Sequence, residues 1–93
     1  MSAPADPIDR ALQHILHRAP QPSRLRFNVD HSRGAGVTRL SDDDLSRDLK
    51  ICVILTDPDH TPPERITREA RGRIYDYAHF IRKEIARRQE LAR

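Results

Sequence analysis

Apolar side chains recur at steps of three and four residues from Thr61 to the end of the chain, which places them on one face of a helix. Thr61, Pro62 and Glu64 suit the cap, the first helical position and the acid of a capping box. The pattern predicts one long helix over residues 62–92. The apolar positions are Ile66, Ala70, Ile74, Tyr77, Ala78, Ile81 and Ile85.

This helix would be roughly 45 Å long at about 1.5 Å per residue, which exceeds the width of a small domain. We therefore expect either a break or bend at Gly72, which we favour, or a helix that projects beyond its core toward a partner.

Two shorter helices are predicted earlier in the chain. Asp6 and Pro7 suit a cap and a first helical position, and the helix that follows stops at Pro20. Residues 1–5 before it are expected to form a disordered tail. Ser41 followed by three aspartates suits the start of a second short helix that carries Leu45 and Leu49.

Three stretches have strand character. Residues 25–30 alternate apolar and polar side chains, and residues 37–40 suggest a short neighbouring strand. Residues 50–56 contain five consecutive apolar side chains, which predicts a strand buried on both faces. The fold class is therefore α+β: one small domain over residues 6–93, with a sheet of two or three strands covered by the N-terminal and long C-terminal helices.

The composition limits the class of protein. Of the 93 residues, 37% are hydrophobic and 33% are charged, and there is no tryptophan, so the core is small and aliphatic. A single cysteine excludes an internal disulfide and favours a reducing, cytoplasmic location. The sequence contains neither a signal-peptide core nor an apolar run of 18 residues, so we expect no membrane association.

The positive charge is concentrated in the last third of the chain. Nine basic residues stand against five acidic ones from Thr61 onward, whereas eight basic stand against nine acidic ones before it. This asymmetry favours a polyanion or an acidic protein surface as partner. The alternative is a solvated helix with internal pairs such as Glu64–Arg68, Glu69–Arg73 and Glu84–Arg88.

The sequence contains few candidate catalytic or metal-binding residues. Asp57, Asp59 and His60, with His31, could supply metal ligands, but Asp-Pro-Asp is ordinary turn chemistry, and we expect no metal or cofactor. The acids in residues 42–44 are better explained as a helix start than as paired catalytic carboxylates.

Cys52 lies within an apolar run and is expected in the core. Gly34 and Gly36 beside Arg33 lack the rest of a nucleotide-binding motif, which leaves a flexible basic loop. We predict that the protein is not an enzyme.

The aromatic residues of the long helix differ in their expected roles. Tyr77 belongs to the apolar face and Phe80 lies at its edge, so both are expected in the core. Tyr75 lies on the opposite side, where its ring could reach a ligand.

Two stretches resemble ribosome-binding factor A, a bacterial family with a KH-like fold. Ser46-Arg47-Asp48-Leu49 precedes the expected strand, and Phe80-Ile81-Arg82 occurs in the long helix. Where the family has a small residue and a glycine before Phe-Ile-Arg, this chain has Ala78 and His79. The resemblance implies binding to small-subunit ribosomal RNA, without catalysis or a cofactor.

The leading hypothesis is a nucleic-acid-binding protein that contacts the phosphates of RNA or DNA, with the small ribosomal subunit as one candidate partner. The alternative is an accessory or inhibitor factor of phage or plasmid type that docks on a large protein target, or forms a homodimer, through the aliphatic face of the long helix. The residues expected to contact phosphates are Arg33, Arg39, Lys50, Arg68, Arg71, Arg82, Lys83, Arg87 and Arg88.

Overall fold

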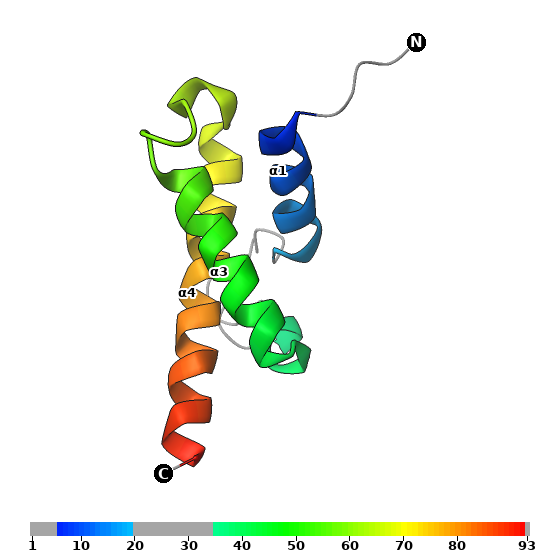
Figure 1. Ribbon diagram of the computed structural model, residues 1–93, viewed down its shortest axis with the longest axis vertical. Helices are drawn as coiled ribbons and strands as arrows, with labels where there is room; N and C mark the ends of the chain where they lie inside the picture. Colours follow the sequence, from blue (N-terminus) through cyan, green and yellow to red (C-terminus); the bar gives the residue numbers. More distant parts are fainter. Residues whose placement is uncertain (1–5, 20–34, 93) are drawn as a thin grey trace.

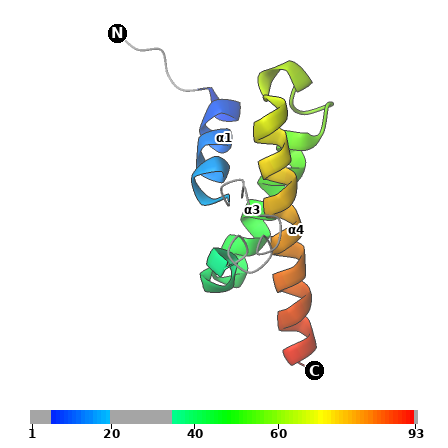
Figure 2. The same cartoon turned by 180° about the vertical axis from the view of Figure 1, so that it is seen from behind.

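The computed structural model describes residues 6–19 and 35–92. The elements in these ranges are all helical: α1 (Pro7–Arg18), the 3₁₀ turn η2 (Ala35–Arg39), α3 (Asp42–Thr56), the 3₁₀ turn η3 (Pro63–Arg65) and α4 (Arg68–Leu91). Helix α4 forms the long axis, α3 packs along it, and α1 lies beside the half of α4 that follows η3 (Figures 1 and 2). The C-terminal turns of α4 extend beyond the other helices (Figure 1).

The predicted α+β fold is wrong for this part of the chain, because none of its residues forms a strand. Residues 50–56, expected as the central strand, are the second half of α3. Residues 37–40, expected as a short strand, lie in η2 and the bend after it. The third expected strand, at residues 25–30, and the expected tail, at residues 1–5, lie outside the described residues.

Helix α3 continues to Thr56 and is longer than the predicted short helix, whose apolar pattern hid the full length because one core position is charged. The Ser41 hydroxyl accepts a hydrogen bond from the Asp44 amide at 3.1 Å, which confirms the predicted helix start. The buried positions are then spaced by three or four residues, but one of them is Asp48, so the apolar pattern is interrupted at mid-helix. Val53 and Ile54 are each 47% exposed, so the apolar run is not buried on both faces. The buried positions are Leu45, Asp48, Cys52 and Leu55.

Helix α4 begins six residues later than the predicted 62–92. The side chain of Thr67 accepts a hydrogen bond from the Ala70 amide at 3.1 Å and caps the helix. The hydroxyl of Thr61, expected as that cap, is buried and donates to the Ile54 carbonyl at 2.8 Å. Thr61 therefore fastens the α3–α4 connection to the end of α3.

Of the break or bend favoured at Gly72, the break is wrong, since α4 continues through this residue as one helix of 24 residues. Gly72 has no positive φ, and a Cβ added to it would meet no atom within 4 Å. No backbone constraint or close contact in the described structure therefore requires a glycine here, and the helix tolerates its lower propensity of about 1 kcal/mol.

The core lies where α1, α3 and α4 meet. Ile15 of α1 is fully buried, as are Ile74 and Ile81 of α4. Tyr77, Phe80 and Cys52 are buried too, which confirms the predictions that they pack in the core. The cap of α1 is confirmed by a 2.8 Å hydrogen bond from the Ile8 amide to the carboxylate of Asp6.

The carboxylate of Asp48 joins the three helices at this core. Its side chain is fully buried and accepts hydrogen bonds from Tyr77 Oη at 2.6 Å and Arg18 Nη1 at 2.9 Å. His14 Nε2 lies 3.0 Å from the other carboxylate oxygen. Burial alone would raise the pKa of Asp48, but the hydrogen bonds from Tyr77, His14 and Arg18 outweigh it and hold that pKa below its usual range.

We expect Asp48→Asn to lower the free energy of unfolding by about 2–4 kcal/mol. Breaking a buried ion pair costs about 3–5 kcal/mol, and the partial exposure of Arg18 and His14 reduces that cost. Urea unfolding followed by circular dichroism measures the difference. Asp43→Asn, on the exposed side of the same helix, is the control and should cost no more than about 1 kcal/mol, the effect of one charge in the first turn of a helix. Equal stabilities of the two variants would contradict the role given to Asp48.

Candidate nucleic-acid interface

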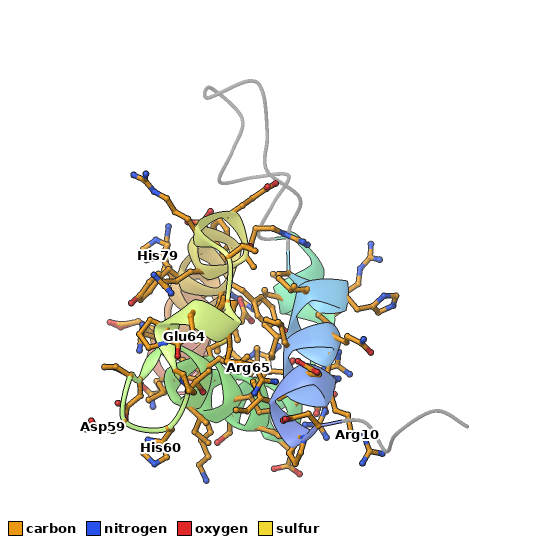
Figure 3. The ribbon with its side chains drawn as sticks, turned by 90° about the horizontal axis from the view of Figure 1, so that it is seen from above. Arg10, Asp59, His60, Glu64, Arg65 and His79 are labelled. Atoms are coloured by element: carbon orange, nitrogen blue, oxygen red, sulfur yellow. The ribbon has the colours of Figure 1, made fainter. Side chains whose placement is uncertain are left out.

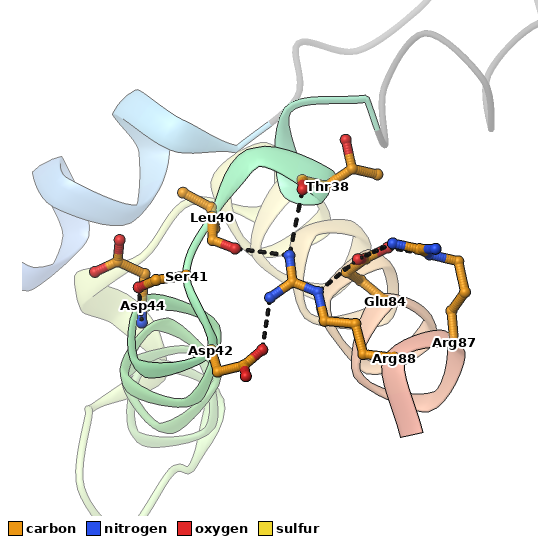
Figure 4. A network of polar contacts seen from close by, with 8 residues as sticks. All are labelled: Thr38, Leu40, Ser41, Asp42, Asp44, Glu84, Arg87 and Arg88. Carbon is orange, nitrogen blue, oxygen red and sulfur yellow. Dashed lines mark hydrogen bonds and ion pairs between the residues drawn. The ribbon is translucent and has the colours of Figure 1, made fainter. Parts of the chain in front are cut away.

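Arg88, one of the residues expected to contact phosphate, is held inside the fold. Its guanidinium donates to Asp42 Oδ1 at 2.7 Å, to Glu84 Oε2 at 2.7 Å and to the Leu40 carbonyl at 2.6 Å (Figure 4). These contacts fasten α4 to η2 and to the first turn of α3. The Glu84–Arg88 pair predicted from the sequence is thereby confirmed, whereas the predicted Glu64–Arg68 pair does not form.

Glu84 also binds Arg87, which makes a bidentate pair through Nε at 2.9 Å and Nη2 at 2.6 Å. The Glu84 side chain is only 5% exposed, whereas that of Arg87 is 55% exposed. The hydrogen bond from Arg87, followed by that from Arg88, lowers the pKa of Glu84 to about 2 despite burial. The charge of Arg87 is therefore largely balanced within the chain.

Three further arginines near the start of α4 stabilise the fold. Arg71 Nη2 donates to the carbonyl of Pro63 at 2.8 Å. Arg73 Nη2 donates to the carbonyls of Leu16 and Ala19 at 2.8 and 3.1 Å, so it caps the C-terminal end of α1. Arg65 lies 3.3 Å from Asp6 and 3.1 Å from Asp9 and ties η3 to the start of α1 (Figure 3).

A second group of cations points to solvent. Arg68, Arg82 and Lys83 are exposed and make no hydrogen bond or ion pair with any residue in the described ranges. Two exposed rings, Tyr75 and His79, lie between them along the helix. We call these five residues the outer face of α4.

Helical spacing places most of this face in one row. Arg68, Tyr75 and Arg82 are separated by seven residues, or two turns, and His79 follows Tyr75 by four. Lys83 lies at the edge of the row. His79 points away from α1 and α3 (Figure 3). The acids Glu69 and Asp76 fall on the same edge as Lys83, and Asp76 already has a partner within the chain.

The structure thus separates the nine predicted phosphate contacts. Arg71, Arg87 and Arg88 are engaged within the chain, whereas Arg68, Arg82 and Lys83 share the outer face. Arg39 and Lys50 are exposed, but they belong to η2 and α3 and so are not part of the outer face of α4. Neither has a partner among the described residues. Arg33 lies outside the described ranges.

The sequence interpretation did not recognise that these residues share one row along the helix. Tyr75 was expected to be free, and its 55% exposure confirms that. His79 was not considered as a ligand contact. The seven-residue spacing that relates Arg68, Tyr75 and Arg82 was the signal that could have grouped them.

The other candidate centres have structural explanations. Asp57 accepts hydrogen bonds from the Asp59 amide at 2.9 Å and from His60 Nδ1 at 2.8 Å, which confirms its turn chemistry. No cluster of three or more His, Cys, Asp or Glu side chains in the described ranges could hold a metal ion, and His31 lies outside them. Burial raises the pKa of Cys52 to about 12, so its thiol is unreactive near neutral pH.

No family model, curated protein or solved structure matches this chain. The KH-like fold that the resemblance to ribosome-binding factor A implies is not the fold of the described residues, because residues 46–55 are continuous helix in α3.

None of the described helices is both long and apolar enough to cross a membrane. Any statement about function therefore depends on the geometry of the chain itself.

We expect the protein to lose stability in acid partly through Glu84. Its pKa is about 2 when folded and 4.5 ordinarily, so its contribution is complete above about pH 4.5 and disappears as the pH falls toward 2. The lowered pKa of Asp48 acts in the same direction. In this pH range one titrating group changes the free energy of unfolding by up to about 1.4 kcal/mol per pH unit. Glu84→Gln should therefore make the dependence of that free energy on pH shallower by up to this amount.

Urea unfolding at several pH values between 5 and 2 measures this slope. Glu90→Gln is the matched control, because Glu90 is exposed and makes no ion pair with the described residues. A Glu84→Gln profile as steep as that of the Glu90→Gln control would contradict the assignment.

Proposed function

We propose that this domain binds the phosphate backbone of nucleic acid through the outer face of α4. The observation that carries the proposal is the grouping of Arg68, Arg82 and Lys83 beside two exposed rings, without partners of their own in the described chain. A folded domain gains nothing internally from such unpaired cations, whereas phosphates can pair with them and release counterions.

The dimensions of the face suit an extended polyanion. Arg68 and Arg82 are 14 residues apart, or about 21 Å along the helix axis. Duplex DNA carries one negative charge per about 1.7 Å of its axis, so both arginines can reach phosphates of one bound molecule. Tyr75 and His79 between them offer rings that can stack on bases.

The rival protein-docking hypothesis depended on an uncovered aliphatic face. Ile66, Ile74 and Ile81 of that face are buried against the chain's own helices, and Ile85 is partly buried, so little of the face is left for a dimer seam. This burial is the reason that nucleic acid is the better supported partner.

The proposed role is binding without catalysis or a cofactor, since the outer face offers cations and rings. A cytoplasmic location, predicted from the single cysteine, is compatible with this role because nucleic acid is accessible there.

Binding should weaken with salt in proportion to the number of phosphates contacted. Three contacts give a slope of about −2 to −3 in log K against log salt, so affinity should fall about 20- to 40-fold between 50 and 200 mM salt. Fluorescence anisotropy of labelled oligonucleotides measures the slope. We expect Arg82→Ala to reduce the slope by nearly one contact while leaving thermal stability unchanged, because Arg82 is exposed and unpaired within the described chain.

Arg10→Ala is the control of equal charge. Arg10 is exposed on α1, on the opposite side of the molecule from His79 (Figure 3). If Arg10→Ala weakens binding as much as Arg82→Ala does, net charge rather than the outer face controls binding. Absence of any binding at 50 mM salt would reject the proposed function altogether.

A further inference from the structure

A pocket opens beside Tyr75, at the junction of α3, η3 and α4. Its volume is about 200 Å³. Pockets that bury whole small-molecule ligands run from about 300 to 1,000 Å³, so this one suits a single planar ring better than a nucleotide or a cofactor. Its lining residues are Leu55, Thr56, Pro58, Thr61, Pro63, Arg71 and Tyr75.

The walls of the pocket combine flat surfaces with fixed polar groups. Tyr75 contributes an aromatic ring that is 55% exposed, and Pro58 and Pro63 contribute rigid apolar rings. The guanidinium of Arg71 is held in place by its 2.8 Å hydrogen bond to the Pro63 carbonyl. Thr61, whose hydroxyl is bonded to the Ile54 carbonyl, keeps the α3–α4 connection folded beneath these groups. A planar heterocycle could stack on such surfaces and receive hydrogen bonds at its edge.

The pocket adjoins the outer face, because Tyr75 belongs to both. Tyr75 lies midway between Arg68 and Arg82, about 10 Å along the helix from each. A strand whose phosphates lie near both arginines would therefore pass the mouth of the pocket. In a duplex the bases are paired and stacked, so only an unpaired base can turn into a side pocket.

We propose that this pocket receives one unpaired nucleobase stacked on Tyr75, so that the domain selects single-stranded over duplex nucleic acid. The inference rests on the proposed function, because the outer face supplies the phosphate contacts on either side of the base. Tyr75 determines strand preference, whereas Arg68 and Arg82 supply affinity that is independent of bases.

The test compares three probes of equal length in anisotropy titrations at low salt. They are a single-stranded 12-mer, made both as RNA and as DNA, its duplex, and a 12-mer phosphate–deoxyribose chain that lacks bases. The full-length protein is measured beside Tyr75→Ala and Tyr75→Phe. Tyr75 is exposed, so both variants should keep the thermal midpoint of the parent protein, which circular dichroism checks.

We expect Tyr75→Ala to weaken binding of the single strand about 5- to 150-fold, the usual effect of removing one stacking ring. Tyr75→Phe should retain the affinity, because the ring is kept. Binding of the duplex and of the base-free chain should not change in either variant. The RNA and DNA forms of the single strand show whether the sugar contributes.

Other results separate this inference from the proposed function. If Tyr75→Ala leaves single-strand binding intact while Arg82→Ala weakens it, phosphate binding stands and the base pocket is wrong. The pocket is also rejected if Tyr75→Ala weakens binding to the base-free chain as much as to the single strand. If no probe binds to the parent protein, both proposals fail together.

Discussion

The buried carboxylate of Asp48 is the interaction on which the arrangement of the helices depends. It lies on α3 and accepts hydrogen bonds from Arg18 on α1 and Tyr77 on α4, with His14 of α1 at 3.0 Å. A fully buried charge is costly unless it is paired, so only the geometry that brings all three helices together satisfies it. Burial and the hydrogen bond to Asp48 raise the pKa of Tyr77, which keeps its hydroxyl a donor. The small apolar core supplies stability, and this carboxylate specifies how the helices meet.

The described arginines fall into two groups, those that pair within the chain and those that project to solvent. Arg73 and Arg88 donate to backbone carbonyls at the ends of neighbouring elements, where helix termini lack internal partners. They join helices in a chain of which only 37% is hydrophobic. Arg68 and Arg82 take no part in this and project from the opposite side of α4. Of these two groups of arginines, the proposed function uses the outward one.

The sequence predicted individual features better than the fold. Caps at Asp6 and Ser41, the buried positions of Tyr77 and Cys52, and the free ring of Tyr75 followed from local chemistry and helical spacing. The central strand was wrong because β-branched residues after Leu49 favoured it locally, whereas the periodicity of α3 depends on Asp48, a residue that looks polar and is buried. The local Glu84–Arg88 pair could be predicted from its spacing, whereas the contacts of Arg73 with Leu16 and of Arg88 with Leu40 could not, because these partners lie about 50 residues away in the chain.

The most direct test of this division of arginines is a chemical-shift titration by NMR. Labelled protein would receive a single-stranded 12-mer at low salt while side-chain guanidinium and backbone amide signals are followed. We predict the largest shifts at Arg68, Tyr75, His79 and Arg82, with the Arg88 guanidinium signal unchanged because it stays bound to Asp42 and Glu84. Shifts centred on Arg88 and η2, with the outer face of α4 unaffected, would contradict the account.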